Sequence, residues 1–178
     1  DRMTQFTTDP ETDRAPVWSP DGRRIIFTCD RAKPGGPANI YMANPAGTGE
    51  VTRLTDSPNQ QAAFSWHPEQ KFVFFQEQRP GTSWDLMVLP LEGSAATGWK
   101  PGTPSVFLGE PGAEVFPQIS PDGRWVSYFA PEAVGVSINV WVRPFPGPGG
   151  KWRVSEGVAR FAEWSPTSHE LLFVDPNA

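Results

Sequence analysis

Two carboxylates in this 178-residue sequence fall at the same place relative to a recurring pattern. Asp13 lies five residues before the stretch WSPDGRRIIF, and Glu114 lies five residues before ISPDGRWVSY. A pair of carboxyl groups at a fixed separation can carry out glycoside hydrolysis. However, a repeated fold places like residues at like positions without any chemistry, and two further copies of the pattern have Gln61 and Ala159 there. Polar residues that line a wet channel are therefore the preferred interpretation, and no catalytic residue is predicted.

Other reactive side chains also lack a catalytic setting. His67 and His169 fall in or beside turns, 102 residues apart, without a second ligand at metal-binding spacing, so exposed turn residues are expected and no metal site. Cys29 ends an apolar run and is expected to be a small core residue. The sequence has neither a Gly-x-Ser-x-Gly nucleophile motif nor a Gly-rich phosphate loop followed by Lys and Ser or Thr. We therefore expect no enzyme activity and no cofactor.

A ten-residue frame recurs four times without insertion or deletion. Its copies are WSPDGRRIIF (18–27), WHPEQKFVFF (66–75), ISPDGRWVSY (119–128) and WSPTSHELLF (164–173). Intervals of 48, 53 and 45 residues separate its prolines, which are Pro20, Pro68, Pro121 and Pro166. This period is typical of propellers and other repeat arrays. The repeats cover approximately residues 13–55, 61–108, 113–155 and 158–178.

Each complete repeat predicts four short strands. One strand precedes the frame and one ends it, and two more follow after connectors rich in Gly, Pro and Asn, as IYMAN and EVTRLT do in the first repeat. No segment has helical periodicity. The sequence therefore predicts an all-β fold, a partial β-propeller of about three and a half four-stranded blades. The segment MTQFT (3–7) is expected to be the last strand of a preceding blade.

The turn within the frame has a physical rationale. In SPDG, proline presets the first corner, Asp bonds the backbone two residues on, and Gly takes a positive φ without a Cβ clash. These residues are Asp21 and Gly22 in the first repeat and Asp122 and Gly123 in the third. The second repeat has HPEQ instead, so a looser turn is expected.

A large residue opens each frame and is expected to fill the gap between adjacent blades. These residues are Trp18, Trp66, Ile119 and Trp164. The alternative, a sugar-stacking platform, is not expected at the same internal position of every repeat.

Composition and charge exclude several classes of partner. The formal net charge is -5 with a pI near 5.0, and no run of Lys or Arg could track phosphates, so nucleic acid is not expected. The longest apolar runs are far shorter than the roughly 20 residues that span a bilayer, so no membrane insertion is expected. A single cysteine leaves the compartment open, and the opening DRMTQFTTDP lacks a signal-peptide pattern. A cytoplasmic protein and an excised part of a longer chain both fit this opening.

The repeats resemble those of TolB-type, WD-repeat-like β-propellers. Those repeats read roughly as aromatic-Ser-Pro-Asp-Gly, a strand, Asp/Asn-Ile-Tyr and then Arg-Leu-Thr, and the first repeat here has WSPDGRRIIFTCDR, NIYMAN and VTRLT. The resemblance implies a periplasmic or extracellular binding module, or the propeller half of a prolyl-oligopeptidase-like peptidase. The segment NVWVRPFPGPGGKWRVS (139–155) most resembles the propeller sensor regions of bacterial Ser/Thr kinases. Because such folds carry grafted sites, the fold alone does not select among these functions.

The expected binding site lies where the first strand of each blade begins. In a propeller this strand faces the central channel, so polar side chains at its start should gather around one mouth, where a repeat protein concentrates recognition. We expect a protein or peptide partner at this mouth. The predicted side chains are Asp13, Arg14, Gln61, Glu114 and Arg160.

The predicted strands are too few to close an ordinary ring. Propellers usually need four to eight complete blades, and the final strand ELLFV would present an unpaired edge. We expect either a homodimer that joins two half-propellers into a ring of about seven or eight blades, or a piece of a longer propeller. A four-bladed closure, with MTQFT completing the final blade, is the remaining alternative.

Overall fold

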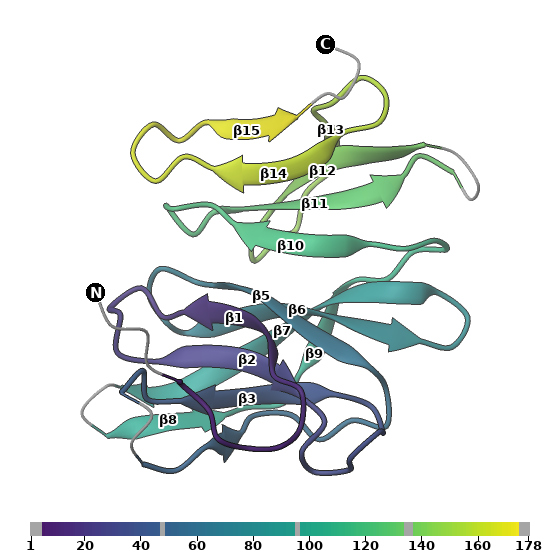
Figure 1. Ribbon diagram of the computed structural model, residues 1–178. Coiled ribbons are helices and arrows are strands. Elements are labelled where there is room, and N and C mark those ends of the chain that lie inside the picture. Colours follow the sequence, from purple (N-terminus) through teal and green to yellow (C-terminus); the bar gives the residue numbers. More distant parts are fainter. Residues whose placement is uncertain (1–4, 47–48, 95–96, 134–136, 175–178) are drawn as a thin grey trace.

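The computed structural model describes residues 5–46, 49–94, 97–133 and 137–174. Within these ranges the chain forms strands, turns and irregular connections without a helix, which confirms the predicted all-β class. None of the described segments is therefore a helix long and apolar enough to cross a membrane. The strands form four antiparallel sheets that follow one another as blades in chain order (Figure 1).

The first three blades are complete, and the fourth has two described strands. The first contains β1 (Arg14–Trp18), β2 (Ile25–Cys29), β3 (Asn39–Ala43) and β4 (Thr52–Arg53). The second contains β5 (Gln61–Trp66), β6 (Phe72–Arg79), β7 (Ser83–Ser94), β8 (Gly98–Pro101) and β9 (Ser105–Leu108). The third contains β10 (Val115–Ile119), β11 (Trp125–Pro131), β12 (Ile138–Pro144) and β13 (Trp152–Arg153). The fourth contains β14 (Arg160–Trp164) and β15 (Leu171–Val174). The chain is thus a partial β-propeller, as the sequence predicts.

The second blade has one strand more than predicted. β7 is 12 residues long, so it pairs with β9 along one part of its edge and with β8 along another. Residues 98–101 are too few and too polar for an apolar alternation, so the sequence does not indicate this strand.

The N-terminal segment is not the strand that the sequence predicts. Gln5–Thr7 has irregular backbone, whereas residues 3 and 4 lie outside the described ranges. No preceding sheet is present among the described residues for this segment to join. Phe6 instead packs edge to face on Phe27, with ring centroids 5.9 Å apart, and covers part of the outer face of the first blade.

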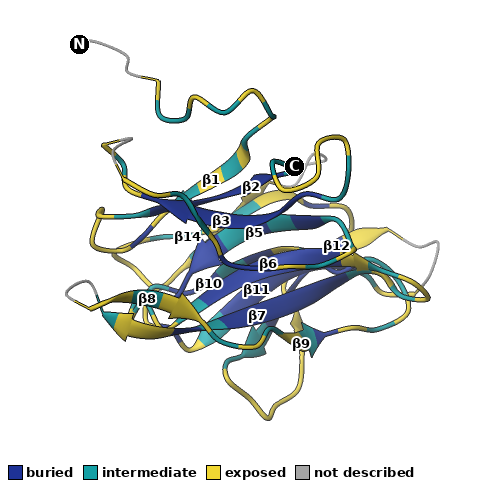
Figure 2. Cartoon of the chain, turned by 90° about the horizontal axis from the view of Figure 1, so that it is seen from below, coloured by how far each residue is buried: buried dark blue, intermediate teal, exposed yellow. Residues whose placement is uncertain are grey.

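The apolar core lies between adjacent blades, where the middle strands are almost entirely buried (Figure 2). Trp66 is 5% exposed and packs with residues of the first two blades. Ile119 is 9% exposed and packs between the second and third blades. The indole N–H of Trp164 donates to the Gln118 carbonyl of the third blade at 3.1 Å. Trp18 is 57% exposed, because no described blade precedes the first one.

The frame turns are equally tight in the first three repeats. In the SPDG turns Gly22 N–H donates to Ser19 O, and Gly123 N–H donates to Ser120 O, both at 2.9 Å. In the second repeat Gln70 N–H donates to His67 O at 2.7 Å, so the expectation of a looser turn is wrong. Gln70 takes the glycine position with a φ of 62°.

His67 is buried, which corrects its prediction as an exposed turn residue. Its Nδ1 accepts from the Glu69 N–H at 3.1 Å, so Nε2 carries the ring proton and donates to Gly123 O at 3.2 Å. Burial lowers the pKa of His67 and favours this neutral form. The turn of the second blade thus docks on that of the third.

Candidate functional site

The five predicted site residues all lie at the beginning of an innermost strand. Arg14, Gln61 and Arg160 open β1, β5 and β14, whereas Asp13 and Glu114 come directly before β1 and β10. These strands belong to four successive blades (Figure 1). Within the described residues, however, the five side chains form no hydrogen bond or ion pair with one another. Three of them, which are Asp13, Gln61 and Glu114, instead have polar partners elsewhere in the chain.

Asp13 belongs to an ion pair within the first blade. Its Oδ1 accepts from Arg31 Nη2 at 2.9 Å, and Arg31 Nε also donates to Cys29 Sγ at 3.3 Å. Burial raises the pKa of Asp13, but hydrogen bonds from neighbours including Arg31 outweigh this effect and hold the pKa below its usual value. Cys29 is 1% exposed, and burial raises the pKa of its thiol, so the side chain is not an activated nucleophile.

Gln61 joins the first blade to the second. It is 1% exposed, and its Nε2 donates to Glu77 Oε2 at 2.5 Å. Its Oε1 accepts from the Thr55 hydroxyl, also at 2.5 Å, and this hydroxyl accepts from the Ile40 N–H at 2.9 Å. The side chain therefore lies inside a buried network rather than at an open mouth.

Glu114 lies in the loop between β9 and β10 and is 2% exposed. Its Oε2 accepts from the Glu110 N–H at 3.3 Å, and its own N–H donates to Trp84 O at 2.8 Å. Burial raises the pKa of its carboxyl group to about 7, and the nearby negative charges of Glu110 and Asp85 act in the same direction. A buried Glu114 and an ion-paired Asp13 do not form an accessible acid and base pair.

Glu114 is expected to make the stability of the chain depend on pH. Its folded pKa exceeds the unfolded value, so the unfolded state loses this proton first as the pH rises. The free energy of unfolding should fall between about pH 4.5 and pH 7, by roughly 3 kcal/mol. Glu114→Gln keeps the acceptor oxygen and should remove this fall, so that the variant is more stable than the native chain at pH 8 and similar to it at pH 4.

Urea unfolding at pH 4, 6 and 8 measures this effect. The exposed Glu163→Gln is the matched control and should retain the native pH dependence. If Glu114→Gln loses as much stability between pH 4 and pH 8 as the native chain, groups other than Glu114 cause the pH dependence.

The innermost strands carry a repeated bulge that sequence reasoning missed. Ala15, Phe116 and Phe161 each lie three residues before the frame, and their φ values are 49°, 58° and 54°. The strand register shifts beside each of them. Non-glycine residues in this conformation cost about 1–3 kcal/mol each. The only sequence signal is their common position, because no residue type there marks a bulge.

The bulges leave aromatic side chains exposed. Phe116 is 51% exposed and Phe161 is 82% exposed, while Phe64 of β5 contacts Phe116 with ring centroids 5.2 Å apart. Arg14 and Arg160, which precede two of the bulges, are also exposed. We call these side chains, which lie along the innermost strands of four successive blades, the inner-strand patch. It consists of Arg14, Phe64, Phe116, Arg160 and Phe161.

Within the described residues, no group of three or more His, Cys, Asp or Glu side chains is arranged to hold a metal ion. His67 and His169 lie on the turns of the second and fourth blades, respectively.

Solved structures with the same arrangement of blades include two TolB proteins. A putative TolB from Agrobacterium tumefaciens superposes with a TM-score of 0.65 and 18% identity, over 92% of this chain and 70% of that one. TolB from Acinetobacter baumannii superposes with a TM-score of 0.64 and 20% identity, over 93% of this chain and 38% of that one. The fold is that of a TolB-type propeller.

Peptidases contain the same arrangement. A puromycin-hydrolyzing peptidase of Mycobacterium tuberculosis superposes with a TM-score of 0.61 and 14% identity, over 85% of this chain and 23% of that one. In sequence, the uncharacterized peptidase YuxL of Bacillus subtilis is 38% identical over 58 residues, which are 33% of this chain and 8% of that protein. No protein-family model matches the chain.

Proposed function

We propose that this propeller is a non-enzymatic module that binds a protein or peptide through the inner-strand patch. The exposure of Phe116 and Phe161 carries the proposal. Both rings project from strained backbone. Phe116 still packs on Phe64 and Phe129, whereas burial of the Phe161 ring offsets little of that strain. Bulges that redirect side chains occur preferentially at barrel rims and beside functional sites. Aromatic and arginine side chains dominate the binding energy of protein interfaces.

Peptides selected from a displayed random library against the full chain test this proposal. Phe161→Ala should lower the affinity for the selected peptides by at least tenfold, since an aromatic anchor contributes about 2 kcal/mol or more to the binding free energy. Val106→Ala is the control, because Val106 is 44% exposed on the outer strand β9, away from the patch. Equal binding to native chain and Phe161→Ala would refute a site at the patch.

The second candidate function is the propeller part of a peptidase. The 38% identity to a segment of YuxL favours it, together with the peptidase folds of the same shape. This sequence lacks a nucleophile motif of the Gly-x-Ser-x-Gly kind, so the chain by itself should not hydrolyse peptide or glycoside substrates. Turnover that Glu114→Gln abolishes would overturn the binding-module proposal in favour of an enzyme.

Two settings for this binding module are proposed. The resemblance of residues 139–155 to kinase sensor regions supports a sensor role within a bacterial receptor kinase, and the TolB-type fold supports a periplasmic scaffold. Either role would use the same patch.

A further inference from the structure

An open pocket of about 410 Å³ lies between the first and second blades, both of which are complete. Of the described residues that line it, only Asp56 and Glu77 are charged, and both are acidic. Leu54, Met87 and Pro104 form an apolar side of the same pocket. The pocket thus combines an apolar wall with two carboxylates, an arrangement that suits a cation on an aliphatic stem.

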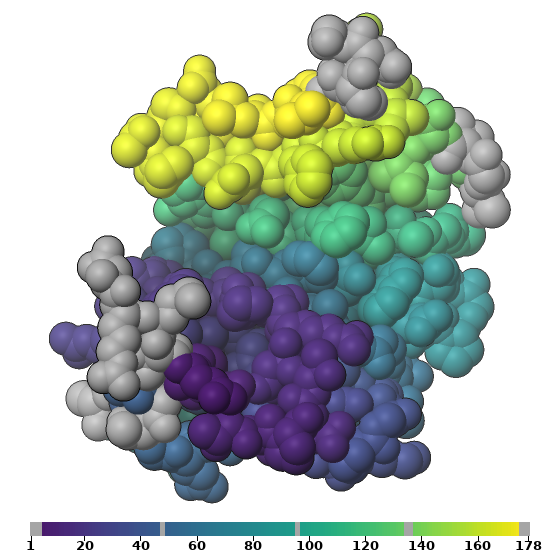
Figure 3. Space-filling model, in the orientation of Figure 1, coloured from purple at the N-terminus to yellow at the C-terminus, as the bar shows by residue number. Residues whose placement is uncertain are grey.

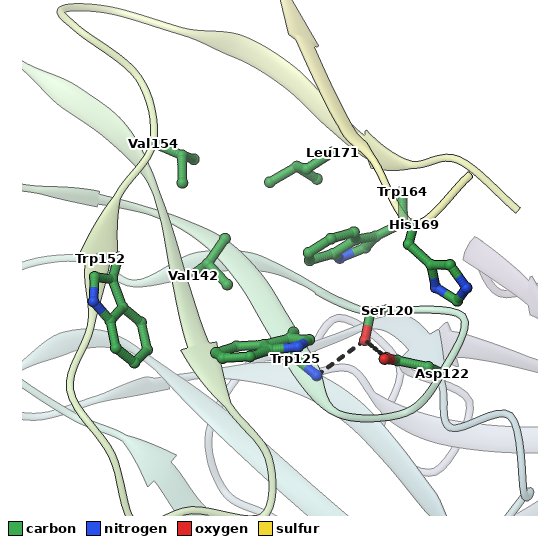
Figure 4. A pocket seen from close by; sticks show the side chains of 9 residues that line it. All are labelled: Ser120, Asp122, Trp125, Val142, Trp152, Val154, Trp164, His169 and Leu171. Carbon is green, nitrogen blue, oxygen red and sulfur yellow. Dashed lines mark hydrogen bonds between the residues drawn. The ribbon is translucent and has the colours of Figure 1, made fainter. Parts of the chain in front are cut away.

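The gap between the second and third blades provides a reference for this pocket. These two blades form the neighbouring teal and green bands of Figure 3. Val88 of β7 pairs with Ser105 of β9 in the second blade, and Val142 of β12 pairs with Trp152 of β13 in the third. Val142 and Trp152 are drawn on their neighbouring strands in Figure 4. Ser105 therefore has the position that Trp152 has one blade later.

In the reference gap, a lysine of the chain itself takes the place of the pocket. Lys151 comes directly before β13, and Pro104 comes directly before β9, so the two residues are equivalent. The ammonium group of Lys151 pairs with the Glu110 carboxylate at 2.5 Å. It also lies over the ring of Trp141, 5.1 Å from the centroid. An acid and an apolar wall thus hold this lysine side chain.

The acid of the reference gap has a counterpart in the pocket. Leu54 and Leu108 are the buried leucines of the first and second outer strands, and each packs in a cluster with the third strand of the next blade. Asp56 and Glu110 are each the second residue after these leucines. The side chain of Asp56 is 84% exposed and pairs with Arg53 at 2.7 Å. A carboxylate accepts several hydrogen bonds, so this pair leaves acceptor sites for a second donor.

The pocket adds a second, buried carboxylate. The side chain of Glu77 is 10% exposed, and its Oε2 accepts from Gln61 Nε2 at 2.5 Å. Arg79 is the cation paired with Glu77, but its Nε is 3.8 Å from Oε1, which is beyond hydrogen-bond distance. A cation in the pocket would therefore stabilise a buried negative charge that its own chain compensates only in part.

The lysine and the aromatic wall of the reference gap have smaller, uncharged counterparts in the pocket. Pro104 stands in place of Lys151, and Met87 stands in place of Trp141, because each directly precedes an equivalent residue of its strand. The first gap is therefore acidic and open where the second is acidic and filled.

We propose that this pocket binds a lysine side chain of a protein partner, as the equivalent gap binds Lys151. The methylene stem lies along Leu54, Met87 and Pro104, and the ammonium group pairs with the two carboxylates. This site is separate from the inner-strand patch and does not rest on the function proposed for it.

The probe for this proposal is N-acetyl-lysine methylamide, which carries the side chain without backbone charges. In the full chain labelled with ¹³C at the methionine methyl groups, the signal of Met87 should shift in a saturable manner. A dissociation constant on the order of 1 mM is expected for a ligand of this size. Met42 does not line the pocket, so its signal should shift less. The norleucine analogue keeps the stem but lacks the ammonium group and should bind about tenfold more weakly.

Variants that remove one carboxylate test the role of charge. Glu77→Gln and Asp56→Asn should each lower the affinity for the probe by about fivefold or more, because each removes a charge-assisted hydrogen bond. Glu92→Gln is the matched control, since Glu92 is an exposed acid of β7 outside the pocket. It should change the affinity by less than about twofold, because solvent screens a distant exposed charge.

Pro104→Lys tests the equivalence with Lys151 directly. The new side chain should occupy the pocket and abolish the shift of Met87 by the probe. Pro104→Gln also loses the proline but adds no charge, and it should retain binding. Circular dichroism of all variants establishes that they fold.

Three results would overturn the proposal. One is the absence of a saturable Met87 shift in the native chain, and another is equal binding of the lysine and norleucine probes. The third is tighter binding of free lysine than of N-acetyl-lysine methylamide, which would assign the pocket to the amino acid rather than to a protein partner.

Discussion

Replacement of Trp66 by alanine should lower the free energy of unfolding by about 3–5 kcal/mol, the usual cost of truncating a buried Trp. Trp66 is 5% exposed and packs in the apolar cluster between the first and second blades, so its truncation leaves a cavity there. Since domains are usually stable by about 5–15 kcal/mol, this one change should remove a large part of the total.

Trp18→Ala is the matched control for Trp66→Ala. Trp18 opens the frame of the first repeat as Trp66 opens that of the second, but it is 57% exposed. Its truncation should cost less than about 1 kcal/mol, as for most surface substitutions. Denaturant titrations of the two variants measure the difference. Equal losses would mean that the gap in front of Trp18 is filled in solution, for instance by a second copy of the chain.

Gly123→Ala should be the second most damaging substitution, and Gly22→Ala its control. Both glycines occupy the fourth position of an SPDG turn, with φ values of 73° and 67°, so alanine costs each about 1–2 kcal/mol of backbone strain. A Cβ at Gly22 would meet nothing within 4 Å. A Cβ at Gly123 would lie 2.5 Å from His67 Nε2 and 3.2 Å from Pro68 Cγ.

The crowding at Gly123 should add a further 1–3 kcal/mol, which is typical of overpacking. Thermal or urea unfolding of the two variants gives this difference directly. The cause can be checked with His67→Ala, because the double variant should lose less stability than the sum of the two single variants. Additive losses would exclude the contact between the second and third turns as the reason.

The sequence predicted the fold well because its repeats are local. Each copy of the frame combines a turn of known chemistry with an apolar strand, and Asp21 and Asp122 accept from the backbone N–H two residues on, at 3.0 and 3.1 Å. The turn in the second repeat was misjudged, because Gln70 adopts the conformation that glycine favours. Packing of this turn against the turn of the third blade outweighs the preference of a non-glycine residue for negative φ.

The candidate site was predictable only in part. Arg14 and Arg160 are exposed where the first strands begin. The burial of Gln61 and Glu114 depends instead on partners that are distant in sequence, such as Glu77 for Gln61 and Trp84 for Glu114. The exposure of Phe161 was missed, because an aromatic residue within an apolar run ordinarily predicts burial. No residue type at this position marks the bulge that turns the ring outward, so the sequence does not indicate it.

The sharing of apolar clusters between neighbouring blades also determines how the chain should come apart. Each blade contacts only the next, so the stability is approximately a sum of blade and interface contributions. The second blade has clusters on both flanks, whereas the fourth packs through one cluster, with Ala162 and Leu171 against the third. Local opening should therefore begin at the fourth blade, with a free energy of opening well below that of global unfolding. In hydrogen exchange, the amide protons of β14 and β15 should then exchange with solvent before those of β6 and β7.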